Sequence, residues 1–91
     1  MSLNPKSRQI LKAKSHQLKP IVMLGNNGLS DAVKKEIERG LTDHELIKIR
    51  ISTVDRDLRK QLYADICESS KAEPVQLIGN IAVIYRKNVD K

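Results

Sequence analysis

The chain of 91 residues has neither Phe nor Trp, and Tyr63 and Tyr85 are its aromatic residues. Two rings cannot form an extended platform for stacked bases, so we expect any readout of base sequence to be limited. The single cysteine, Cys67, excludes an internal disulfide and is typical of a reducing compartment. The longest apolar runs have four or five residues, too few for a signal-peptide core or a membrane span, so we expect a cytoplasmic protein without a membrane partner.

Positive charge is in excess, with 17 Lys and Arg against 11 Asp and Glu and a net charge of +6. A basic domain of this size favours a polyanionic partner, most often nucleic acid, although many small proteins are basic without one. Residues 1–20 contain five cations and no acidic residue, namely Lys6, Arg8, Lys12, Lys14 and Lys19. The length predicts one domain over residues 1–91, because a second core has no room.

Apolar periodicity and capping residues predict three helices and four strands. The helices are expected over residues 5–16, 31–41 and 56–69, and the strands over residues 21–24, 45–52, 75–78 and 81–86. Asn4, Ser30 and Asp55 are suited to cap the three helices, and residues 42–44 are expected to form a connector. Gly79-Asn80 predicts a primed two-residue turn in a hairpin.

This order, a helix followed by β-α-β-α-β-β, predicts a two-layer fold of the α/β (α+β) type. The sheet is expected to be mixed and four-stranded, with its first two strands parallel and the helices on one face. In the second strand, alternation predicts that Ile47, Ile49 and Ile51 are buried and that Lys48 and Arg50 form a basic, solvated face. Three helical stripes are expected to face the core: Leu3, Ile10, Leu11 and Leu18 in the first helix, Leu29, Val33, Ile37 and Leu41 in the second, and Leu58, Leu62, Ile66 and Cys67 in the third.

Residues suited to catalysis or metal binding are few. His16 and His44 lie in different segments, with no Cys or carboxylate at the spacing of a metal site. Cys67, on the apolar side of a predicted helix, is typical of a small buried side chain, and Ser30 is explained as a helix cap. The sequence therefore predicts no enzyme, no catalytic residue, no metal, no cofactor and no small-molecule substrate.

The motif Gly25-Asn26-Asn27-Gly28 joins an apolar strand to a capped helix. Glycine adopts positive φ without steric cost, and the N-terminus of a helix binds anions well. KH domains clamp a nucleic-acid backbone with a loop of this kind. The motif alone is weak, since its usual alternative is an ordinary turn, but the basic domain and the cationic first helix favour contact with a nucleic-acid backbone.

Three segments together resemble the CRM domain family (chloroplast RNA splicing and ribosome maturation): KPIVMLGNNGLS at 19–30, HELIKI at 44–49 and VQLIGNIAVIYR at 75–86. The length resembles that of the free-standing bacterial YhbY-type members. The resemblance implies a fold similar to the C-terminal domain of translation initiation factor three, and RNA binding by the glycine loop with neighbouring cations. It also implies an association with precursors of the large ribosomal subunit. Many relatives carry Lys or Arg between the two glycines, where this chain has Asn26 and Asn27.

The leading hypothesis is an RNA-binding protein of ribosome assembly, with precursor large-subunit rRNA and the pre-ribosomal particle as partners. Gly25 and Gly28 would set the backbone path, and Asn26 and Asn27 would donate to phosphate or sugar oxygens. The cations expected to neutralise phosphates are Lys12, Lys14, Lys34, Arg86 and Lys87. The alternative is an adaptor that docks on a ribosomal protein through the basic strand face. DNA binding is a weaker hypothesis, because the sequence contains no recognisable recognition helix. An enzyme acting on a phosphorylated metabolite is also weaker, because no general base is expected near the loop.

Overall fold

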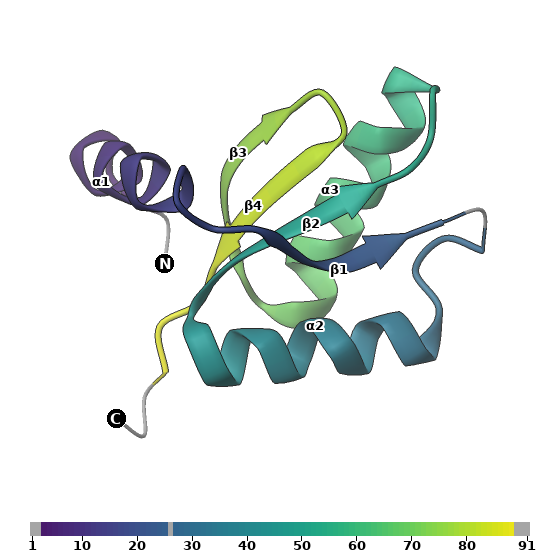
Figure 1. Cartoon of the computed structure of the whole chain (residues 1–91), viewed down its shortest axis with the longest axis horizontal. Coiled ribbons are helices and arrows are strands. Elements are labelled where there is room, and N and C mark those ends of the chain that lie inside the picture. The colour runs from purple at the N-terminus through teal and green to yellow at the C-terminus, as the bar shows by residue number, and fades with distance from the viewer. Residues whose placement is uncertain (1–2, 26, 89–91) are drawn as a thin grey trace.

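The computed structural model describes residues 3–25 and 27–88, which form three helices and one four-stranded sheet (Figure 1). The elements in chain order are α1 (Pro5–Ser15), β1 (Pro20–Leu24), α2 (Asp31–His44), β2 (Leu46–Ile51), α3 (Arg56–Ser70), β3 (Glu73–Ile78) and β4 (Ile81–Tyr85). The predicted element order and the mixed sheet are therefore confirmed.

The strands lie in the order β1-β2-β4-β3. β1 is parallel to β2, as predicted for a strand–helix–strand unit, and β4 is antiparallel to both of its neighbours. Gly79 has a φ of +55°, as the first position of a primed hairpin turn requires. At the edge of the sheet, the pairing of β3 with β4 is irregular between Pro74 and Gln76.

α2 and α3 pack on one face of the sheet, here called the inner face, and enclose an aliphatic core. Ile47, Ile49 and Ile51 are all buried there, which confirms the alternation predicted for β2. The rest of the buried cluster comes from Val22, Leu24, Ile37, Leu41, Ile66, Ala72, Ala82 and Ile84. Leu58 was expected to face this core, but the residue is 46% exposed, because the first turn of α3 extends past the end of the sheet (Figure 1).

α1 packs on the opposite, outer face of the sheet, so the prediction that the helices cover one face is wrong. Val75 and Val83 are buried outside the inner core, and α1 contacts their strands as well as β2. Val83 pairs with Lys48, which points away from the inner face. α1 covers only one end of the outer face, and part of its predicted apolar stripe stays exposed to solvent. Ile10 is 51% exposed and Leu18 is 37% exposed.

α2 continues to His44, so the connector predicted at residues 42–44 is instead the last turn of this helix. The helix ends at Glu45, whose φ of +64° turns the chain into β2 while its N–H still donates to the Leu41 carbonyl at 2.9 Å. A positive φ is uncommon for a residue other than glycine. Among the described residues, no helix has the length and apolar character needed to cross a membrane.

Candidate functional site

The glycine loop lies between the end of β1 and the start of α2, and Asn26 is outside the described residues. The Gly28 N–H donates to the Gly25 carbonyl at 3.0 Å, which closes a tight turn. Gly28 has a φ of +65°, whereas a Cβ atom added to it would lie 4.0 Å from the nearest side chain. Backbone conformation, and not lack of space, therefore requires glycine at position 28. Gly25 has no positive φ, and a Cβ atom added to it would meet nothing within 4 Å.

Both ends of the loop are fixed to the core. The Ser30 hydroxyl accepts a hydrogen bond from the Val33 N–H at 3.3 Å, so Ser30 caps α2 as predicted. At the other end, the Ser52 N–H donates to the Leu24 carbonyl at 2.8 Å, which ties the end of β1 to the segment after β2. Asn27 is exposed between these anchors, beside the N-terminus of α2, where the helix dipole favours anions.

A cleft of about 220 Å³ separates the glycine loop from the start of α3. Gly25, Asn27 and Gly28 form one side of it, and the apolar residues along it are Ile51, Leu58 and Leu62. The exposed part of Leu58 thus belongs to this cleft. Its volume is below the roughly 300 Å³ at which sites for small molecules usually begin.

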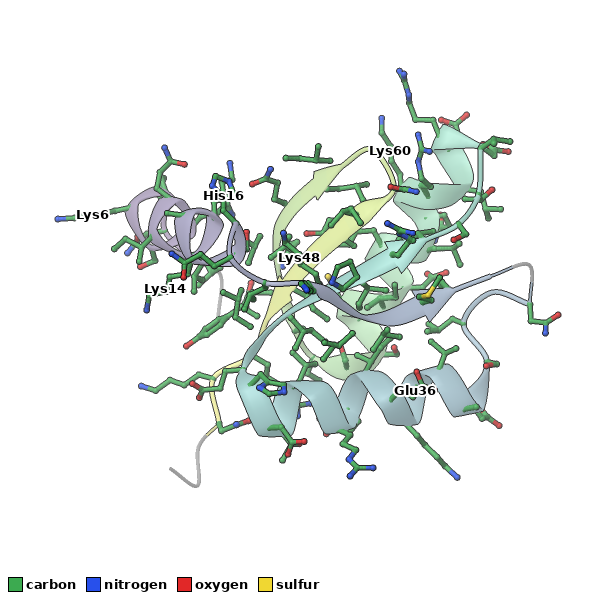
Figure 2. All side chains as sticks on the ribbon, in the orientation of Figure 1. Lys6, Lys14, His16, Glu36, Lys48 and Lys60 are labelled. Carbon is green, nitrogen blue, oxygen red and sulfur yellow. The ribbon has the colours of Figure 1, made fainter. Side chains whose placement is uncertain are left out.

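The five cations proposed from the sequence do not form one cluster. Lys34 is exposed in the first turn of α2, close to the glycine loop. Lys12 and Lys14 belong to α1, at the other end of the longest axis of the molecule, which extends 33 Å (Figures 1 and 2). Lys87 is exposed just after β4, a strand that α1 contacts.

Other cations connect these two ends, and sequence reasoning left them out of the site. Lys48, labelled in Figure 2, lies on the outer face between α1 and the glycine loop, and Arg50 follows it toward the loop. On the far side of the cleft, Arg59 Nη1 donates to the Thr53 carbonyl at 3.1 Å, and Lys60 is exposed near the start of α3. The parallel pairing of the first two strands was the signal that could have placed Arg50 beside the loop.

Arg86 is the predicted cation with the most contacts inside the fold. Its Nη1 donates to Glu38 Oε2 at 2.8 Å and to the Ser70 carbonyl at 3.0 Å, and its Nη2 donates to Thr42 Oγ1 at 3.3 Å. The hydrogen bond from Arg86 lowers the pKa of the Glu38 carboxyl. A phosphate contact by Arg86 stays a prediction, and it would have to compete with these three acceptors.

The two histidines and Cys67 belong to other parts of the fold than the glycine loop. His16 and His44 are exposed in different elements, and the described ranges contain no group of three His, Cys, Asp or Glu residues that could hold a metal ion. Cys67 packs against the core, and burial raises the pKa of its thiol to about 11, so it is protonated and weakly nucleophilic near neutral pH.

Comparison with known proteins gives a consistent result. The model of the CRS1/YhbY (CRM) domain family matches residues 3–86. A Pseudomonas aeruginosa protein named "Probable RNA-binding protein PA4753" is 41% identical over 88 residues, covering 97% of this chain and 85% of that protein. A Haemophilus influenzae protein named "RNA-binding protein" is 45% identical over 85 residues, covering 93% and 86%. The solution structure of SAV1595 from Staphylococcus aureus superposes with a TM-score of 0.84 at 32% identity, covering 94% of this chain and 90% of that one.

Proposed function

Because this chain belongs to the CRS1/YhbY (CRM) domain family, we propose that it binds RNA, and specifically precursor large-subunit rRNA in an assembling ribosomal particle. The names of the Pseudomonas and Haemophilus relatives support the RNA partner. The sequence resemblance to bacterial YhbY-type members supports the ribosomal target. In this proposal the protein is a cytoplasmic binding module that performs no catalysis.

The observation that carries the proposal is the conformation of the glycine loop. Gly28 holds a positive φ, the loop is closed by its hydrogen bond to Gly25, and the capped N-terminus of α2 follows directly. In this arrangement, a phosphate of the RNA backbone approaches the loop without meeting a side chain at Gly25 or Gly28. The amides of Asn26 and Asn27 donate to phosphate or sugar oxygens, which positions the RNA but supplies no charge.

Charge comes from the surrounding cations. Lys34 acts beside the loop, Lys48 and Arg50 act along the outer face, and a third group of lysines acts at the α1 end of the molecule. This last group consists of Lys12 and Lys14 of α1 and Lys87 just after β4. When these cations neutralise RNA phosphates, condensed counterions are released, and this release supplies a large share of the affinity for RNA.

The loop is tested by placing negative charge where phosphate is proposed to bind. We expect the Asn26→Asp/Asn27→Asp variant to bind a precursor-rRNA fragment about tenfold or more weakly, as measured by fluorescence anisotropy. Asn27 is exposed, so circular dichroism should show an unchanged fold. Gln61→Glu is a control that adds a negative charge on an exposed position of α3, and its affinity should stay within about twofold of wild type. Wild-type affinity in the loop variant would refute the loop assignment.

The ribosomal target needs a separate experiment. Ultraviolet crosslinking in cells, followed by mapping of the crosslinked sites, should recover precursor large-subunit rRNA. The adaptor alternative predicts instead that the protein stays on pre-ribosomal particles after ribonuclease digestion. Release by ribonuclease supports RNA as the direct partner, whereas retention favours a ribosomal protein.

A further inference from the structure

Four residues form a row across the outer face of the sheet, next to the glycine loop. The strand register pairs Met23 with Arg50, Arg50 with Ile81, and Ile81 with Ile78. Their chain neighbours Leu24, Ile51, Ala82 and Leu77 contribute to the inner core. Because successive side chains of a strand alternate between faces, all four residues lie on the outer face, and we call them the outer row.

The outer row is largely exposed. Met23 is 61% exposed, Ile78 is 60% exposed, Arg50 is exposed and Ile81 is partly buried. The next outer-face position of β4, Val83, is only 4% exposed, because α1 covers that end of the face. Large apolar side chains gathered on one bare face of a small protein mark a contact surface.

The charge of this surface restricts its partner. Arg50 stands within the row, and the adjacent outer-face row pairs Lys48 with Val83 and Val83 with Gln76. These two rows contain no acidic residue at the paired positions described. A complementary ligand is therefore apolar and anionic at once, a combination that unpaired nucleotides offer through their base faces and phosphates.

Position favours RNA over a protein as this ligand. Met23 precedes Gly25 by two residues, so an RNA strand held at the loop passes directly onto the outer row. We infer that the outer row contacts unpaired bases of the bound RNA, with Met23, Ile78 and Ile81 against base faces and Arg50 against a base plane or phosphate. The inference rests on the proposed function and extends it from the RNA backbone to the bases. It also explains how a chain without Phe or Trp contacts bases, since aliphatic side chains replace the usual rings.

The test uses the variant Met23→Thr/Ile78→Thr, in which both new side chains are polar and β-branched and therefore suited to strands. Its probes are an oligoadenylate of about 12 nucleotides and an abasic oligomer of equal length, whose phosphates are the same. We expect the variant to bind oligoadenylate about tenfold more weakly than wild type does, and to bind the abasic oligomer equally well. The slope of log affinity against log salt should be unchanged, because no phosphate contact is removed.

The matched control is Ile10→Thr/Leu18→Thr, which changes two exposed apolar residues in and just after α1, away from the outer row, with exposures of 51% and 37%. Its affinity for oligoadenylate should stay within about twofold of wild type. Wild-type affinity in Met23→Thr/Ile78→Thr would overturn the inference. If this variant keeps wild-type affinity but is no longer retained on ribonuclease-treated particles, the outer row contacts a protein partner. That outcome would overturn the inference as well.

Failure of this inference can be told apart from failure of the proposed function. If the Asn26→Asp/Asn27→Asp variant loses affinity and the outer-row variant does not, RNA binding at the loop stands and the base contact is wrong. If wild type binds none of the RNA probes, the proposed function fails, and the inference fails with it.

Discussion

The guanidinium of Arg86 and the carboxylate of Glu38 form an ion pair at 2.8 Å that joins the end of β4 to α2. The same guanidinium also donates to the Ser70 carbonyl at the end of α3. One side chain therefore fastens the last strand to both inner helices. The sequence alone suggested a phosphate contact for Arg86. Replacing Arg86 therefore shows whether the residue stabilises the fold or binds RNA.

We expect Arg86→Ala to lower the free energy of unfolding by about 1–3 kcal/mol, because three acceptors lose a charged donor. Glu38→Gln should cost less than about 1 kcal/mol, since the Glu38 side chain is 57% exposed and solvent screens the pair. Urea denaturation measures both values. Lys87→Ala is the control and should change stability by less than about 0.5 kcal/mol. If Arg86→Ala were as stable as wild type and bound RNA more weakly, Arg86 would be a phosphate contact instead.

The Glu38 pair also predicts a pH dependence. Its hydrogen bond from Arg86 lowers the pKa of the folded carboxyl. The stabilisation is therefore complete above the pKa of the unfolded carboxyl and is lost as the pH falls through the lower, folded pKa. In Arg86→Ala this acid-side loss should be smaller than in wild type, as measured by urea denaturation over a series of acidic pH values.

Tyr63→Phe should lower the free energy of unfolding by about 1 kcal/mol. The Tyr63 hydroxyl of α3 donates to the Val83 carbonyl of β4 at 2.8 Å, next to the irregular part of β3. Burial raises the pKa of this phenol, so stability should also fall as the pH rises through the unfolded tyrosine pKa, about 10. Thermal unfolding followed by circular dichroism checks both effects. Tyr85→Phe is the control, and an equal loss there would argue against the Val83 hydrogen bond as the cause.

Cys67 should react slowly with iodoacetamide in the folded protein at about pH 8, because burial raises the pKa of its thiol to about 11. Mass spectrometry should show fast alkylation once denaturant exposes the residue. The folded state also binds more protons than the unfolded state between the unfolded thiol pKa, about 8.5, and about 11, so stability should fall as the pH rises through this window. Cys67→Ser should remove that part of the pH dependence. Rapid alkylation of the folded protein would contradict the burial of the thiol.

Asp55→Ala should destabilise the protein by about 1 kcal/mol through the loss of a helix cap. The Asp55 Oδ1 atom accepts hydrogen bonds from the N–H groups of Asp57 at 2.9 Å and Leu58 at 3.1 Å. Asp55→Ser keeps a capping oxygen and should recover most of the stability, as measured by urea denaturation. Equal losses in the two variants would show that the negative charge, rather than the cap, supplies the stabilisation.

RNA affinity should depend steeply on salt. For single-stranded RNA, each neutralised phosphate contributes about −0.7 to the slope of log affinity against log salt, so Lys48→Gln should make the slope shallower by about this amount. Glu36→Gln changes an exposed charge on α2, away from the outer face (Figure 2), and should leave the slope as it is. A complex insensitive to salt would contradict the proposal that surface cations neutralise RNA phosphates.

Much of the fold could be predicted because independent local signals agreed. Asn4, Ser30 and Asp55 each cap the helix that they were expected to cap, and the alternation in β2 identified its buried face. The end of α2 was missed because the chain turns at Glu45, a residue type that gives no sign of a positive φ.

The face covered by α1 and the outer row depend on information that a single sequence does not carry. The four-residue row requires the register of three strand pairs at once, and irregularities at Pro20/Val22 and Pro74/Gln76 shift two of those registers. The glycine motif predicted where the candidate site begins. It did not identify Arg50 as a neighbour, because the sequence predicted that β1 and β2 are parallel but not the register that pairs Arg50 with Met23.

The irregular pairing of β3 has a consequence for how the molecules behave toward one another. β3 is an edge of the sheet, and an open edge can recruit a strand from another molecule. Here Pro74 has no N–H to offer, the ladder is interrupted between Pro74 and Gln76, and Arg8 Nε of α1 donates to the Pro74 carbonyl at 3.4 Å. A further strand therefore finds no regular template along this part of β3, which disfavours pairing between two molecules through this edge of the sheet.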